Sequence, residues 1–203
     1  MSLSVNKTAS EQVVPVFLKI LEDIPGGITI KTANIPSDVT QLKAGTLVTE
    51  SSSTSGLYNL VKNAKSTSTQ VSNVSITVKR PHLFKTGEFI GKYAGHTAST
   101  ITTITHTAAT TDTIVTTTAV GALATTTRLI NCTVACRGAG TDVTLKYSPG
   151  AILKETVAVR NSDLSTLKNV TGAAIAQGSV IEANLPYYVT DTDKTTLKHF
   201  RFA

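Results

Sequence analysis

The chain has 203 residues, of which 40% are hydrophobic and 16% are charged, and its formal net charge is +6. Burial of that much apolar surface offsets the entropy lost on ordering, so the composition excludes a disordered chain. The sequence contains no run of about 20 apolar residues, which excludes a membrane-spanning helix, and we expect no membrane partner. Its first dozen residues lack the apolar core of a signal peptide, so we expect synthesis and folding in the cytosol.

The basic residues are scattered along the chain, and Lys79 and Arg80 form the only adjacent pair. Nucleic-acid modules usually concentrate positive charge on one face and interleave aromatic side chains that stack on bases. Only 5% of the residues are aromatic. We therefore expect no nucleic acid among the partners.

Residues 1–24 form the first predicted element, an N-terminal arm with an apolar second half. An amphipathic helix capped by Ser10 is one alternative, but Pro15 would remove a helical hydrogen bond and clash with the preceding turn. An extended edge strand is the other alternative, because proline is tolerated at the edge of a sheet. The sequence leaves both open.

Short elements follow the arm. Residues 24–27, Ile-Pro-Gly-Gly, predict a turn, because proline fixes φ and glycine supplies positive φ. Residues 28–32 alternate like a half-buried strand. Residues 37–45 predict one short helix, with Ser37 as its N-cap and Gly45 just after its end.

Threonine makes up much of residues 99–118. Apolar residues recur among the threonines on both sides of a polar stretch at 108–112. This pattern predicts a β-hairpin whose threonines are half exposed. These apolar residues are Ile101, Ile104, Ile114 and Val115.

The remaining pattern completes a β-rich chain. Further strands are expected at 74–78, 129–136, 141–150, 156–159 and 179–189, and a helical turn at 163–170. Short strands about every 8–12 residues predict an all-β fold: an antiparallel β-barrel or sandwich with few short helical turns and an extended N-terminal arm. We divide the chain into the arm (1–24), a first β region (25–80) and a second β region (81–203), which could be continuous with the first.

Residues that could carry catalysis or bind a metal form no recognisable motif. The 13 acidic residues offer no evident pair for acid–base work, and the histidines lack metal-ligand spacing. Asp191 and Asp193 form a D-x-D motif, which we interpret as a solvated turn. Cys132 and Cys136 are too far apart along one strand for a disulfide, so we expect free thiols. The sequence therefore predicts no enzyme, no catalytic residue, no metal and no cofactor.

Several short sequence segments resemble segments of the head decoration, auxiliary capsid or head-fibre proteins of tailed bacteriophages of Bacteroidetes, crAss-like phages included. These segments are residues 24–27, 42–48, 61–65, 78–90, 101–105, 112–118, 120–123 and 181–187. The resemblance implies a β-rich structural protein without catalysis, bound to the outside of an icosahedral shell and often oligomeric. It also implies that the partner is the major capsid protein and that the protein is assembled into virions in the host cytoplasm.

The N-terminal arm is the contact element that we expect on the capsid, because an apolar segment interrupted by proline suits strand addition to another chain. The expected contact residues are Val13, Val14, Val16, Phe17, Leu18 and Leu21. Two alternatives to a decoration protein stay open: another virion part, such as a tail, baseplate or fibre-base protein, and a glycan-binding β-sandwich.

Overall fold

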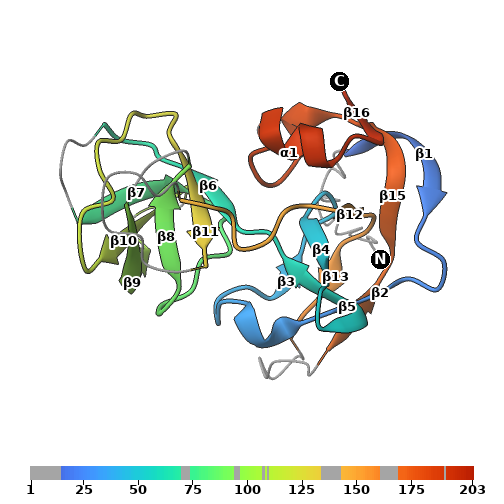
Figure 1. The fold of residues 1–203 in the computed structure, drawn as a ribbon, viewed down its shortest axis with the longest axis horizontal. Helices are drawn as coiled ribbons and strands as arrows, with labels where there is room; N and C mark the ends of the chain where they lie inside the picture. Colours follow the sequence, from blue (N-terminus) through green and yellow to red (C-terminus); the bar gives the residue numbers. More distant parts are fainter. Residues whose placement is uncertain are drawn as a thin grey trace, which may run out of the picture.

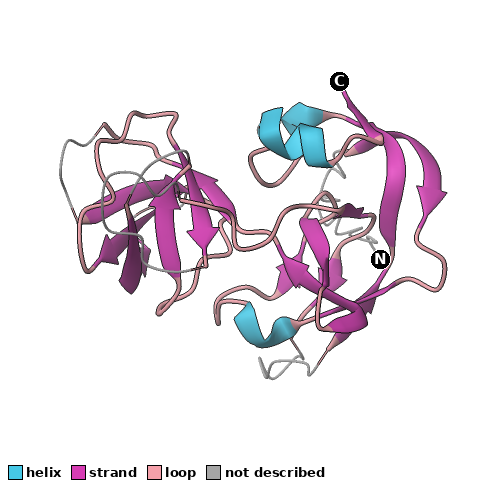
Figure 2. Ribbon diagram, viewed as in Figure 1, coloured by secondary structure: helices cyan, strands magenta, loops and turns pink. Residues whose placement is uncertain are grey.

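The structure is a computed structural model, and it describes residues 15–69, 74–93, 97–106, 108, 110–133, 143–160, 169–189 and 191–203. Strands dominate it and helical segments are few and short, which confirms the predicted mainly β fold (Figure 2). Figure 1 shows the strands grouped in two lobes, which we call the six-stranded lobe and the eight-stranded lobe. The six-stranded lobe comes from the middle of the chain.

The six-stranded lobe is one curled antiparallel sheet in the order β6-β11-β8-β9-β10-β7. Its strands are β6 (Asn63–Lys65), β7 (Ser75–Lys79), β8 (Phe89–Lys92), β9 (Ala98–His106), β10 (Thr111–Thr116) and β11 (Arg128–Cys132). A β-bridge between Ser66 and Val78 brings the two ends of this order together. The curled sheet encloses a core that includes Phe84, Ile90 and Leu129.

The threonine-rich segment is the hairpin of β9 and β10, as predicted. Ile104 lies opposite Ile114, and Ile101 and Ile114 are buried in the core of the lobe. Thr102 and Thr103 are exposed. Isoleucines of the hairpin thus face the core and several of its threonines face solvent, whereas Thr116 is buried.

The eight-stranded lobe is a mixed sheet in the order β1-β15-β12-β4-β5-β2-β14, with β16 also paired to β15. Its strands are β1 (Phe17–Asp23), β2 (Ile28–Ile30), β4 (Leu47–Ser51), β5 (Thr54–Leu60), β12 (Ala151–Leu153), β14 (Val170–Gly172), β15 (Ala174–Val180) and β16 (Phe200–Phe202). The short elements are β3 (Gln41–Leu42), paired with β13 (Val157–Ala158), the 3-10 helices η1 (Thr32–Asn34) and η2 (Glu182–Asn184), and the helix α1 (Asp191–Thr196). Apolar clusters built around Val48 and Leu47 fill its interior.

The helix predicted for residues 37–45 is wrong, because these residues form turns and β3. Arg160 provides the physical reason. Its guanidinium group donates hydrogen bonds to the carbonyl oxygens of Pro36 and Val39, both at 3.0 Å, and so engages acceptors that a helix would use. Leu42 then pairs with Val157, far along the chain. Tertiary pairing overrides the local helical signal.

The pairing of strands joins residues 17–60 to residues 151–202 and places the six-stranded lobe between them in the sequence. The domain boundaries expected at residues 24 and 80 stay a prediction. The choice left open for the N-terminal arm is decided for residues 17–23, which form the edge strand β1 and not a helix.

Candidate functional site

The strand β1 lies at the outer edge of the eight-stranded lobe (Figure 1). Within the described residues it pairs on one side only, with β15. An open edge presents backbone groups and side chains that another chain can contact. This edge is therefore the candidate partner-binding surface, and it falls within the segment that the sequence indicated.

Two of the three irregularities in the pairing of β1 with β15 place leucines outside the ladder. The paired positions are Phe17 with Val180, Lys19 with Ser179, Ile20 with Gly178, and Glu22 with Gln177. Leu18 and Leu21 are the extra residues at these two β-bulges. A bulge leaves its extra residue unpaired and bends the strand, which can redirect a side chain. Leu18 and Leu21 are 60% and 55% exposed, far more than is usual for leucine.

The predicted contact residues divide into three groups. Val13 and Val14 lie outside the described residues. Val16 and Phe17 pack against the apolar core of their own lobe. Leu18 and Leu21 point their exposed surface away from that core.

Ile20, which was not among the predicted contact residues, is 39% exposed. The signal that could have identified it was its position in the same apolar run. The apolar side chains available on the edge are therefore Leu18, Ile20 and Leu21.

Gly178 determines how closely β1 can approach β15. A Cβ atom on Gly178 would lie 2.7 Å from the backbone carbonyl oxygen of Lys19, closer than such atoms approach. Only glycine permits this contact without a shift of β1. The far end of β1 is held by an ion pair, in which Asp23 and Lys154 approach to 2.5 Å. Both contacts position the exposed leucines.

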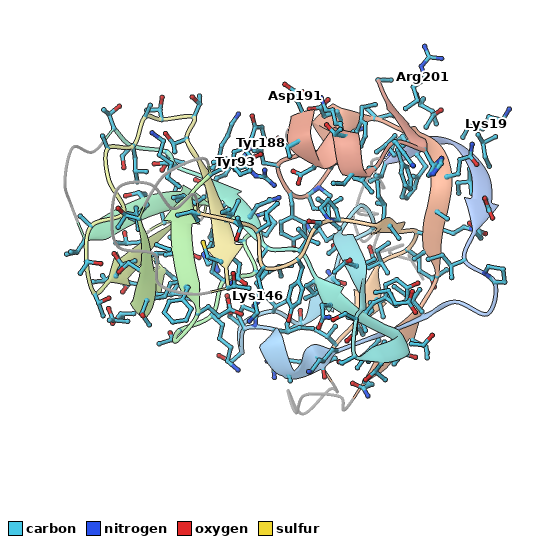
Figure 3. All side chains as sticks on the ribbon, viewed as in Figure 1. Lys19, Tyr93, Lys146, Tyr188, Asp191 and Arg201 are labelled. Carbon is cyan, nitrogen blue, oxygen red and sulfur yellow. The ribbon has the colours of Figure 1, made fainter. Side chains whose placement is uncertain are left out.

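Basic side chains flank the exposed leucines. Figure 3 shows Lys19, on β1, and Arg201, on β16, projecting outward from the same end of the eight-stranded lobe. Both residues are exposed. Glu22 and Asp23 on β1 are also exposed, so the edge combines apolar anchors with charged groups of both signs, as the polar rim of an interface does.

A second feature is a charged cluster around Asp112, at the start of β10. This carboxylate is almost fully buried. Its Oδ2 accepts a hydrogen bond from Nε2 of His82 at 2.9 Å and lies 3.3 Å from Nε of Arg80, and its Oδ1 lies 3.0 Å from Nδ1 of His106. The sequence reasoning missed this cluster. Only the pairing of His106 with Asp112 across the hairpin had a sequence signal.

Asp38 extends this cluster across the junction between the lobes. Its carboxylate lies 3.7 Å from Arg80 and 3.7 Å from Nε2 of His106. Asp38 belongs to a turn of the eight-stranded lobe, whereas Arg80 and His106 belong to the six-stranded lobe. The cluster therefore joins the two lobes through charged groups.

His82 is the buried histidine of the cluster. Burial lowers its pKa more than the nearby Asp112 carboxylate raises it, so the ring is neutral near pH 7. Its Nε2–H donates to Asp112, and its buried Nδ1 has no hydrogen-bond partner among the described residues. The site thus accommodates the uncharged ring and offers no acceptor for a second ring proton.

The lobes are also joined near α1. Arg128 donates to Asp193 at 2.6 Å in a fully buried ion pair, and the hydroxyl of Tyr93 donates to Thr192 at 2.6 Å. Tyr93 and Tyr188 lie between the lobes in Figure 3. The interpretation of the D-x-D motif as a solvated turn is wrong for Asp193, because the motif lies in α1 and Arg128 holds this carboxylate in the interior.

Two clefts of about 490 Å³ and 630 Å³ lie where the lobes meet. The larger one has His82, His106 and Asp38 in its walls, together with Lys85 and Arg160.

Within the described ranges, no group of three or more histidine, cysteine or acidic residues could hold a metal ion. No helix in those ranges is long and apolar enough to cross a membrane. Cys132 is buried and Cys136 lies outside the described residues, so the free thiols stay a prediction.

Comparisons with models of protein families, with curated proteins and with solved structures found no match to this chain.

Proposed function

We propose that this chain is a structural protein of a bacteriophage virion, bound to the outer surface of the capsid, and that β1 contacts the major capsid protein. The observation that carries the proposal is the open edge of β1, where two bulges hold Leu18 and Leu21 exposed. The choice of partner rests on the resemblance of residues 78–90 and 181–187 to phage decoration proteins.

The bulges favour one mode of contact over another. A continuous strand added to β1 needs a regular ladder of hydrogen bonds, and a bulge interrupts that ladder. Exposed leucines instead suit insertion into apolar pockets of a partner, as the central anchors of an interface do. We therefore propose that Leu18 and Leu21 act as side-chain anchors, with Lys19 and Arg201 steering the contact.

A stable contact of this kind buries about 1,000 Å² or more. The two leucines supply its apolar centre, and neighbouring surface of the eight-stranded lobe supplies the rim. Since the lobes are joined through buried ion pairs, the six-stranded lobe could rest on an adjacent capsid subunit. A protein that spans two subunits in this way would stabilise the expanded shell.

The test of the docking surface is the double substitution Leu18→Ser and Leu21→Ser, with binding to purified expanded shells that lack the protein measured by co-sedimentation. Burial of one leucine contributes about 1.5–3 kcal/mol, and 1.4 kcal/mol is a factor of ten. We therefore expect binding to weaken by about a hundredfold. Both side chains are exposed, so the melting temperature should stay nearly unchanged.

Val74→Ser is the control, since Val74 is 43% exposed but lies in the six-stranded lobe, outside the apolar edge of β1. We expect it to weaken binding far less than the double substitution does. Unchanged binding of the double variant would remove β1 from the proposal. Failure of the original chain to bind any shell, together with binding to tails or to glycans, would instead support one of the two alternatives.

A further inference from the structure

The segment that carries His82 enters the cores of both lobes. It follows β7, and the Arg80–Pro81 peptide bond is cis. Leu83 is buried in the apolar cluster of the eight-stranded lobe, whereas Phe84 is buried in the cluster of the six-stranded lobe. Two consecutive side chains of this segment thus pack in the cores of two different lobes. Any displacement of this segment would loosen both lobes and the junction between them.

We propose that residues 80–84 act as a pH-sensitive latch between the two lobes, which is closed while His82 is neutral and is loosened when its buried ring gains a second proton. The geometry carries the proposal. His82 is buried, its Nε2–H is already used by Asp112, and Nδ1 has no acceptor within the described residues. A proton on Nδ1 would therefore create a buried, unsatisfied donor on a charged ring.

The surrounding charges do not remove this cost. Asp112 and Asp38 favour a positive ring, and Arg80 opposes it. Lys43, Lys85 and Arg160 lie in the walls of the adjoining clefts and add positive charge on that side. Burial is the largest influence on the ring and lowers its pKa, so the neutral form is favoured in the folded state.

His106 also faces Asp112 and Asp38, from the end of β9. Its side chain is about half exposed, however, and its contact with Asp38 is 3.7 Å long. Solvent screening leaves exposed pairs of this kind weak. The buried ring of His82 therefore determines whether the junction is weakened or strengthened as the pH falls.

The direction in which stability changes with pH follows from the proton affinities of the folded and the opened segment. The unfolded or opened segment binds a proton near pH 6.5, whereas the folded segment binds it only at lower pH. Between these two values the open form takes up more protons, so stability falls as pH falls. Within that window, each pH unit changes the opening equilibrium by up to tenfold.

Hydrogen exchange of the full-length chain tests the latch at about pH 7.5 and about pH 5.0, with rates corrected for the intrinsic effect of pH on exchange. In the original chain we expect residues 82–86 to lose protection at the lower pH, by at most about thirtyfold, because the opened segment binds its proton near pH 6.5. The variant His82→Gln keeps a donor for Asp112 but cannot gain a charge. It should lose little or no protection.

His199→Gln is the control, since His199 lies outside the cluster, and it should respond to pH like the original chain. An equal response of the original chain and His82→Gln would overturn the latch. If His82→Gln does not fold, the ring protons of His82 are titrated by NMR in the original chain. A midpoint below about 6.5 supports the latch, and a midpoint at or above that value overturns it.

Discussion

Arg128 and Asp193 illustrate how single residues join the lobes. They come from β11 and α1, which are far apart in the sequence, and their side chains meet at 2.6 Å in the interior. The ring of Tyr93 lies 4.8 Å from the Arg128 guanidinium carbon and provides a further favourable contact. A buried pair of this kind is sensitive to the loss of one partner, because the remaining charge stays out of water.

Asp193→Ala should therefore lower the free energy of unfolding by about 3–5 kcal/mol, measured by urea denaturation. Asp191→Ala is the control on the same helix, since the Asp191 side chain is fully exposed, and it should change the stability little. Similar effects of the two substitutions would show that the buried pair does not hold α1 against the six-stranded lobe.

At the scale of elements, β1 depends on the close approach that Gly178 allows. Gly178→Ala should push β1 away from β15, because the added Cβ would meet the Lys19 carbonyl oxygen. We expect faster hydrogen exchange in Phe17–Asp23 and weaker binding to shells. Gly150→Ala is the control, since a Cβ there meets only the Thr49 hydroxyl at 3.8 Å. Unchanged exchange in β1 after Gly178→Ala would contradict this role of the glycine.

The elements also show which parts of the fold were predictable. The hairpin of β9 and β10 is local, so its alternation was visible in residues 99–118. The segment 37–45 carries a helical signal, but Arg160 and β13 bind it from more than a hundred residues away. Sequence periodicity does not contain that information.

The candidate sites, too, were predictable only where their residues are close in the sequence. The apolar run of β1 was visible in the sequence, whereas its bulges depend on the register with β15. The cluster around Asp112 gathers Asp38, Arg80, His82 and His106 from three separate segments. Only the His106–Asp112 pair is local enough to be inferred from a hairpin.

At the scale of the whole molecule, two β lobes meet along a junction that contains the cluster around Asp112, the Arg128–Asp193 ion pair and the segment with Leu83 and Phe84. β1 lies on the side of the eight-stranded lobe away from this junction (Figure 1). A capsid subunit could therefore contact β1 without disturbing the junction. This arrangement separates the proposed docking surface from the proposed latch.

The proposal that this chain is a capsid surface protein can be tested by electron cryo-microscopy of phage particles that contain it. We expect two-lobed density repeated over the whole outer surface of the shell, with β1 facing the major capsid protein and Leu18 and Leu21 buried in the contact. Density confined to the tail or to one vertex, or β1 facing solvent in particles that carry the protein, would contradict it.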